Sequence, residues 1–280
     1  MKLNPTQTLR IRTARYIAVR GLKTALFSPG MYLSVTVGCV LASAVVHTYV
    51  GAIAENGLLI ASDLLTSPLY LATSIGVVYL AVATSVSVSR ERDSGTLEVL
   101  FYGPVDAVGY VTGKYLEQLL VFASMLCLQA AALLVWARLT NFGFARALTL
   151  GIILSIGLAS SVTSLGLWLS TVASSTRAAM TSLIALIALF LGIEWSQTLL
   201  ADANPAAMSP ILARAASALS AAGKAAVWVS PFANMDLGMR AIASGNAPGY
   251  VLRLAYSAVY SAVFLVLCVV SLRRKGVRGK

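Results

Sequence analysis

Residues 147–171 read ALTLGIILSIGLASSVTSLGLWLST, without a single charged side chain. An α-helix rises about 1.5 Å per residue, so about 20 apolar residues are enough to cross a hydrocarbon core roughly 30 Å thick. Stretches of comparable length and hydrophobicity occupy residues 31–54, 69–89, 113–137, 178–200 and 251–272. The pattern predicts an all-α polytopic membrane protein with six transmembrane helices, organised as a single domain over residues 1–280.

The composition agrees with this interpretation. Of the 280 residues, 58% are hydrophobic and 11% are charged, whereas a soluble domain has about 45–50% apolar and about 25% charged residues. A water-soluble domain is therefore excluded. The first apolar stretch begins near residue 31 and is longer than the apolar region of a signal peptide, about 7–15 residues, so we expect a retained helix. The cysteines, which lie far apart in separate apolar stretches, predict neither a disulfide framework nor a zinc site (Cys39, Cys127 and Cys268).

The net charge of +11 comes mainly from Lys and Arg residues in the segments between and outside the spans. Their distribution is typical of membrane topology, so no nucleic-acid partner is expected. With six crossings, both termini lie on one side of the membrane. That side receives 15 of the 21 Lys and Arg residues, and the opposite side receives six. Because cytoplasmic loops are enriched in Lys and Arg, we expect a cell-membrane protein with both termini in the cytoplasm.

Two flanking segments are expected to contact membrane lipids. Residues 1–30 predict a basic helix in the cytoplasmic interface, with Arg15 intruding on an apolar face formed by Ile11, Ala18, Leu22 and Ala25. Residues 201–250 form a long external segment with an apolar stripe from Met208 to Ala226. We expect one or two short amphipathic helices that dip into the outer leaflet, rather than a seventh crossing.

The most polar stretch, residues 90–112, separates the second and third expected spans. It begins Arg90-Glu91-Arg92-Asp93-Ser94-Gly95-Thr96-Leu97-Glu98-Val99-Leu100-Phe101-Tyr102-Gly103-Pro104-Val105. Ser94 or Asp93 can cap a short helix with Glu98 in its first turn, and Gly103-Pro104 can end it. Leu97, Leu100 and Phe101 then form a protruding apolar knob. Such a helix can dock into a cytoplasmic partner or can simply rest on lipid headgroups.

The segment from Glu91 to Val105 contains the pattern E-x-x-x-G-T-L-E-x-L-x-x-x-P-V, and Gly113-Lys114 follows it. This arrangement after the second span resembles the type-2 ABC exporter permease family, and Ser230-Pro231-Phe232 is a further likeness. The tail at 106–110 has less charge than the family pattern. The resemblance implies a coupling helix that contacts a separate cytoplasmic ABC ATPase, which binds ATP and Mg, and a second permease copy or paralogue. The coupling residues it implies are Arg90, Glu91, Arg92, Gly95, Thr96, Leu97, Glu98, Leu100, Phe101 and Pro104.

The stretch Gly109-Tyr-Val-Thr-Gly113-Lys114-Tyr115 superficially resembles a phosphate-binding loop. That loop needs four residues between its glycines and a Ser or Thr after its lysine, whereas this chain has three residues and a tyrosine. We expect the chain to bind no ATP itself, and Lys114 to extend toward the cytoplasmic interface. Catalytic groups do not cluster in any one segment, so an enzyme is not expected, and neither is a cofactor or a metal.

Three polar residues within the spans have open roles. Glu117 suits an interfacial ion pair with Lys114 or a proton or substrate site. Glu194 suits a partly hydrated carboxylate near the outer end of its span or a cation-attracting vestibule. His47, the only histidine, suits a hydrogen-bonded contact between helices.

Three functions compete at this point. The first is a permease subunit that exports a hydrophobic or amphiphilic substrate. An ion-coupled secondary carrier would need titratable groups at the midplane and usually an internal repeat, and neither is evident. A nontransporting scaffold or sensor subunit is equally compatible with six spans.

Overall fold

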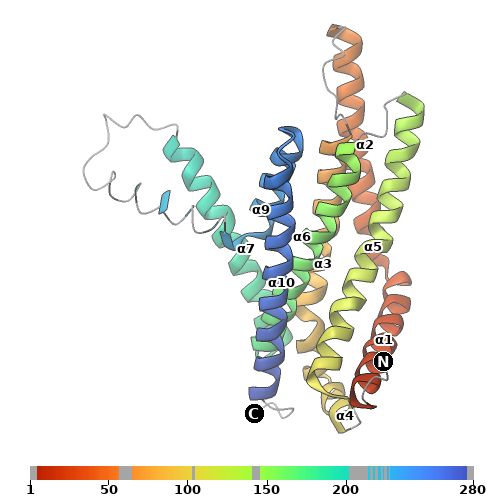
Figure 1. Cartoon of the computed structure of the whole chain (residues 1–280), viewed down its shortest axis with the longest axis vertical. Helices are drawn as coiled ribbons and strands as arrows, with labels where there is room; N and C mark the ends of the chain where they lie inside the picture. The colour runs from red at the N-terminus through yellow and green to blue at the C-terminus, as the bar shows by residue number, and fades with distance from the viewer. Residues whose placement is uncertain are drawn as a thin grey trace.

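The computed structural model describes residues 5–56, 65–102, 105–140, 146–201 and 228–275, together with positions 214, 217, 220, 221, 223 and 226. Within these residues the chain is helical and has no strands (Figure 1). The helices are α1 (Pro5–Leu26), α2 (Pro29–Asn56), α3 (Thr66–Asp93), α4 (Thr96–Tyr102), α5 (Ala107–Thr140), α6 (Arg146–Val172), α7 (Thr176–Ala201), α9 (Pro231–Ala243) and α10 (Ala247–Lys275).

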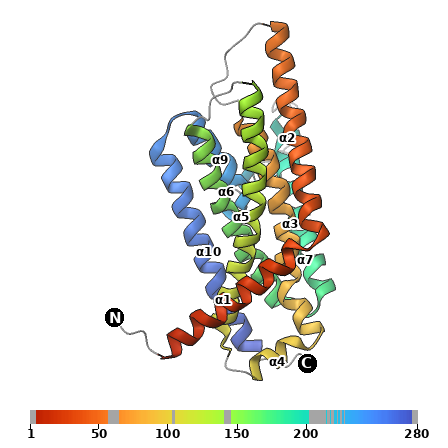
Figure 2. The same ribbon diagram turned by 90° about the vertical axis from the view of Figure 1, so that its right-hand side faces the viewer.

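In this part of the chain, six helices are long and apolar enough to cross a membrane: α2, α3, α5, α6, α7 and α10. They correspond to the six predicted spans, and the all-α membrane architecture is confirmed. The ends of the helices differ from the predicted ends. α3 continues to Asp93 and α5 already begins at Ala107, so most of the polar stretch between the predicted spans is helical. We call the end of the bundle that holds α4 the α4 end; α1 starts and α10 finishes there (Figure 2).

Helix α6 lies at the centre of the bundle and contacts α3, α5, α7, α9 and α10. Small side chains allow these helices to approach closely. A Cβ atom at Gly166 would overlap the Thr84 hydroxyl of α3. Ser170 adds a polar contact, because its Oγ accepts hydrogen bonds from the Val88 and Ser89 amides, each at 3.0 Å. The C-terminal part of α3 is thereby fixed to α6.

Helix α1 crosses α5 at the α4 end (Figure 2). Ala14 and Ala18 are buried in the contact. A Cβ atom at Gly113 of α5 would lie 3.2 Å from Ala14 Cα. Because this crossing selects small residues, the packed face is centred on Ala14 and Ala18. Of the predicted apolar face, Ala18 is buried against α5 whereas Ile11 is 56% exposed, and Arg15 is exposed as well. The position of this face in the membrane interface stays a prediction.

Helix α9 is a short helix that packs against α6 and α10. Ser230 caps it by accepting a hydrogen bond from the Ala233 amide at 3.4 Å, and Pro231 occupies the start of the helix. The Tyr260 hydroxyl donates to Val229 O at 3.1 Å. Tyr260 lies 13 residues after Ala247, the first residue of α10. Val229, just before α9, therefore contacts α10 about 20 Å from the start of that helix. With 13 residues, α9 is too short to cross a membrane. The predicted stripe from Met208 to Ala226 lies largely outside the described residues.

His47 and Glu194 are two polar residues of the predicted spans. His47 is exposed on α2, so the predicted contact between helices is wrong for this residue. The side chain of Glu194 lies outside the described residues. No group of metal-binding side chains occurs within the described ranges.

Candidate coupling site at the α4 end

A tight turn connects α3 to α4. The Ser94 amide donates to Arg90 O and the Gly95 amide donates to Arg92 O, both at 3.0 Å. Gly95 has φ +72°, a left-handed conformation that costs a residue with a Cβ atom about 1–2 kcal/mol. A Cβ atom there would meet nothing within 4 Å, so glycine is required for backbone conformation and not for space. The hydroxyls of Ser94 and Thr96 both donate to Glu91 O, at 3.2 and 3.1 Å.

The apolar face of α4 packs on the chain itself. Leu97 is 1% exposed and lies in a cluster with residues of α3, α5, α6 and α10. Leu100 and Phe101 pack against the same cluster, and the Phe101 ring lies 5.7 Å from the Tyr110 ring, centroid to centroid. The prediction of a protruding knob is therefore wrong. The apolar face has the predicted residues, but they anchor α4 to the bundle.

The residues that protrude are Val99, which is 71% exposed, and Tyr102, which is 82% exposed. They lie on the side of α4 opposite Leu97, as the helical period requires. The sequence interpretation missed them because it assigned the apolar face to the partner. Their signal was present: two large apolar side chains lie on the face of a seven-residue helix that should be polar.

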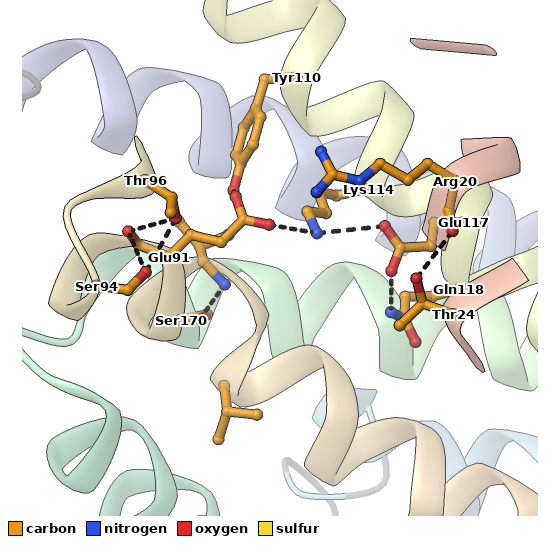
Figure 3. A network of polar contacts seen from close by, with 12 residues as sticks. Arg20, Thr24, Glu91, Ser94, Thr96, Tyr110, Lys114, Glu117, Gln118 and Ser170 are labelled. Carbon is orange, nitrogen blue, oxygen red and sulfur yellow. Dashed lines mark hydrogen bonds and ion pairs between the residues drawn. The ribbon is translucent and has the colours of Figure 1, made fainter. Parts of the chain in front are cut away.

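Glu91, the first residue of the motif, forms contacts within the chain (Figure 3). Its Oε1 lies 2.7 Å from Lys114 Nζ, and its Oε2 accepts a hydrogen bond from the Tyr110 hydroxyl at 2.6 Å. Lys114 Nζ also lies 3.3 Å from Glu117 Oε2. The ion pair predicted for Glu117 is formed. The interfacial extension predicted for Lys114 is wrong, because its side chain is 12% exposed and is held between two carboxylates.

Helix α1 closes over this charge network. A Cβ atom at Gly21 would overlap the Glu117 carboxylate, so a larger residue where α1 passes would force the Glu117 side chain to move. On the other side of the crossing, Asp106 accepts a hydrogen bond from the Gly109 amide at 2.8 Å and pairs with Arg10 Nε at 2.7 Å. Asp106 thus caps α5 and connects it to α1. Sequence reasoning singled out neither Asp106 nor Gly21.

The two charged residues after Glu91 contact other helices. Arg92 donates from Nη1 to Ala173 O at 2.6 Å and from Nη2 to Thr171 O at 3.2 Å, at the end of α6. Asp93 Oδ2 accepts from the Thr176 amide at 2.8 Å, at the start of α7. The sequence predicts that Ser94 or Asp93 caps α4. The Asp93 alternative is wrong, because its carboxylate accepts from the first amide of α7, and the Ser94 hydroxyl donates to Glu91 O. Among the remaining predicted residues, Arg90 is exposed and Glu98 is half-buried, whereas Pro104 lies outside the described residues.

The site therefore consists of an exposed tip on α4 and a base of buried contacts with α1, α3, α5, α6 and α10.

A family model described as ABC-2 family transporter protein matches residues 9–277. No curated protein matches the chain. The matched range includes the six candidate spans and the site at the α4 end. The chain belongs to the ABC-2 transporter family and is the permease component of an ABC transporter.

Proposed function

We propose that this chain is driven by a separate ABC ATPase that binds the α4 tip, and that it exports a hydrophobic or amphiphilic substrate. The observation that supports ATPase binding is the division of α4 into two faces. One face anchors the helix through Leu97, and the other presents Val99 and Tyr102 to solvent. A large aromatic side chain beside an aliphatic one, presented on a fixed helix, is suited to fill a pocket in a partner.

The proposal divides the residues at the α4 end into two groups, a tip and a base, and the tip includes two residues that the sequence did not predict. The tip comprises Val99 and Tyr102. Of the predicted charged residues, Arg90 at the end of α3 is exposed, and Glu98 of α4 is half-buried. The base comprises the residues that hold α4 on the bundle: Glu91, Gly95, Thr96, Leu97, Leu100 and Phe101. Arg92 belongs to neither group, because it contacts the end of α6. Base residues set the angle at which the tip meets the partner. They are expected to affect coupling through the position of α4 rather than through direct contact.

The remaining parts of the proposal follow from the charge pattern and the family. The cation distribution supports a cytoplasmic α4 end in the cell membrane. By family resemblance, the chain pairs with a second copy or a paralogue, and ATP and Mg bind in the ATPase and not in this chain. The export direction rests on the same resemblance. The substrate class rests on the apolar residues that the spans expose, such as Ile184 and Val259.

An ion-coupled carrier has less support. The buried acidic residue Glu117 is paired with Lys114 near the α4 end, whereas a carrier would need a titratable site near the midplane. A nontransporting scaffold would need no exposed apolar tip on a fixed helix.

The test is association with an ABC ATPase encoded beside the chain. We expect the double variant Val99→Ala/Tyr102→Ala to weaken association about tenfold or more, since loss of one hot spot costs about 2 kcal/mol. The matched control is Val135→Ala/Tyr32→Ala, which truncates two exposed residues on the spans. Equal ATPase affinity for both double variants and for the unmodified chain would refute the docking assignment.

A further inference from the structure

Three consecutive charged residues at the end of α3 contact three different helices. Glu91 contacts α5, Arg92 contacts the last carbonyls of α6, and Asp93 contacts the first amide of α7. We propose that Arg92 and Asp93 form a clamp through which displacement of α4 moves the N-terminal end of α7. We call this end, which begins at Thr176, the root of α7. This inference rests on the proposed function, because the displacement comes from the ATPase.

In the first half of the clamp, Arg92 supplies hydrogen-bond donors to carbonyl groups at the C-terminal end of α6. The last four carbonyls of a helix have no partner within the helix and carry partial negative charge. The guanidinium of Arg92 reaches Ala173 O at 2.6 Å and Thr171 O at 3.2 Å. A planar group with several donors can bind two carbonyls at once. The end of α3 is thereby fixed to the end of α6, one turn beyond the contact between Ser170 and the Val88 and Ser89 amides.

The Asp93 half holds the beginning of α7. The first amides of a helix have no partner within the helix and favour a negative charge. Asp93 Oδ2 accepts from the Thr176 amide at 2.8 Å, and Ser175 Oγ accepts from the Ala178 amide at 3.3 Å. Ser175 is the local cap, whereas Asp93 lies 83 residues away in the sequence. The second contact therefore adds a connection between helices that the local cap does not supply.

Helix α7 depends on this root because it has little other contact. Among its described side chains only Ala179 and Leu183 are buried, and the helix leans away from the bundle toward its far end (Figure 1). From Thr176 to Ala201 the helix rises about 37 Å. A tilt of about 5° at the root would move the far end by about 3 Å over that length. A small displacement at the clamp is therefore enlarged along α7.

The connection from α4 to the clamp is short and hydrogen-bonded. The turn after Asp93 is closed by the Ser94 and Gly95 amides, and the Thr96 hydroxyl at the start of α4 donates to Glu91 O. Leu97 packs in the same cluster as Val88 of α3 and Leu167 of α6. A push on the α4 tip thus reaches residues 91–93 through packed and hydrogen-bonded contacts, which is the physical requirement for coupling between two sites.

Hydrogen–deuterium exchange of the permease–ATPase complex tests the clamp without knowledge of the substrate. The complex is compared without nucleotide and with ATP plus orthovanadate. Amides in residues 96–102 report docking at the tip, and amides in residues 174–183 report transmission to α7. In the unmodified complex we expect nucleotide to change exchange in both segments.

The variants are Arg92→Ala and Asp93→Ala, with Asp93→Asn as the conservative substitution that retains an acceptor oxygen. We expect both alanine variants to keep the nucleotide-dependent change at 96–102 and to lose it at 174–183, and Asp93→Asn to restore much of it. Control variants are Arg240→Ala and Asp236→Ala, which break an exposed ion pair on α9 and should behave as the unmodified chain. A purely structural role would alter exchange at 174–183 without nucleotide and leave the nucleotide-dependent change in place.

The outcomes separate the two proposals. The clamp is refuted, and the docking proposal stands, if nucleotide changes amide exchange at 174–183 equally in the alanine variants and in the unmodified complex. The same holds if nucleotide changes exchange at 174–183 in none of these complexes. If no ATPase associates with the unmodified chain, the proposed function fails and the clamp fails with it.

Discussion

The Glu91 carboxylate and the Lys114 ammonium lie 2.7 Å apart, so the first and last residues of the motif meet in space although 22 residues separate them. Between them the chain leaves α3, forms α4 and enters α5. The pair therefore closes the segment that carries the α4 tip. This explains why the motif combines a glutamate before the turn with a lysine after it, although neither residue is part of the exposed tip.

The first prediction concerns this ion pair. Lys114→Met leaves both Glu91 and Glu117 without their shared cation, whereas Glu91→Gln leaves Lys114 paired with Glu117. Removing one partner of a buried pair costs about 3–5 kcal/mol. We therefore expect Lys114→Met to lower the thermal unfolding temperature in detergent more than Glu91→Gln does. Equal and small effects of the two variants would show that the network is too hydrated to stabilise the fold.

The second prediction uses two glycines with the same backbone conformation. Gly95 has φ +72° and Gly245, after α9, has φ +69°, and a Cβ atom at either position would meet nothing within 4 Å. Alanine should therefore cost a similar 1–2 kcal/mol of stability at each position. Only Gly95→Ala should also reduce ATPase stimulation in the assembled complex, because only Gly95 sets the direction of α4. Loss of stimulation in Gly245→Ala, or none in Gly95→Ala, would contradict the role assigned to the turn.

The third prediction concerns the crossing of α1 and α5. Gly113→Ala places a Cβ atom 3.0 Å from Ile17 Cβ and 3.2 Å from Ala14 Cα. Overpacking of this kind costs about 1–3 kcal/mol. The control is Gly51→Ala on α2, where a Cβ atom meets nothing within 4 Å and alanine should favour the helix by up to about 1 kcal/mol. Thermal unfolding in detergent is the measurement, and an unfolding temperature for Gly113→Ala at or above that of Gly51→Ala would show that α1 does not pack as described.

The spans could be predicted from the sequence, but their ends and the roles of α4 could not. Apolar length determines which segments cross a membrane, and all six were found. Residues 107–112 read AVGYVT and continue the apolar stretch without a charged residue, so hydropathy does not mark a boundary at residue 113; the helix already begins at Ala107, where Asp106 caps it. The apolar face of α4 was correctly composed, but periodicity alone does not tell whether the chain or a partner covers Leu97. The partner of Asp93 is an amide 83 residues away, a distance at which local capping rules carry no information.

The fourth prediction concerns orientation. Ser94 and Ser217 are both exposed, and the cation distribution assigns them to opposite sides of the membrane. In a chain whose native cysteines have been replaced, a membrane-impermeant thiol reagent added to intact cells should label Ser217→Cys. It should label Ser94→Cys only after the membrane is permeabilised. The reverse pattern would invert the topology and remove the α4 tip from the reach of a cytoplasmic ATPase.

The last prediction is that the purified chain binds no nucleotide in the absence of an ATPase. A phosphate-binding loop presents free backbone amides and a free lysine to the phosphates. Here Gly109 and Gly113 lie within α5. The Gly109 amide donates to the Asp106 carboxylate, Gly113 lies inside the helix, and both glycines face α1 across the helix crossing. Lys114 is engaged by Glu91 and Glu117, so a phosphate would have to displace two carboxylates to reach it. Isothermal titration of the isolated chain with ATP and Mg should therefore give no binding heat, and Lys114→Met should leave the titration unchanged. Saturable binding that Lys114→Met abolishes would contradict this assignment and would place a nucleotide site at the start of α5.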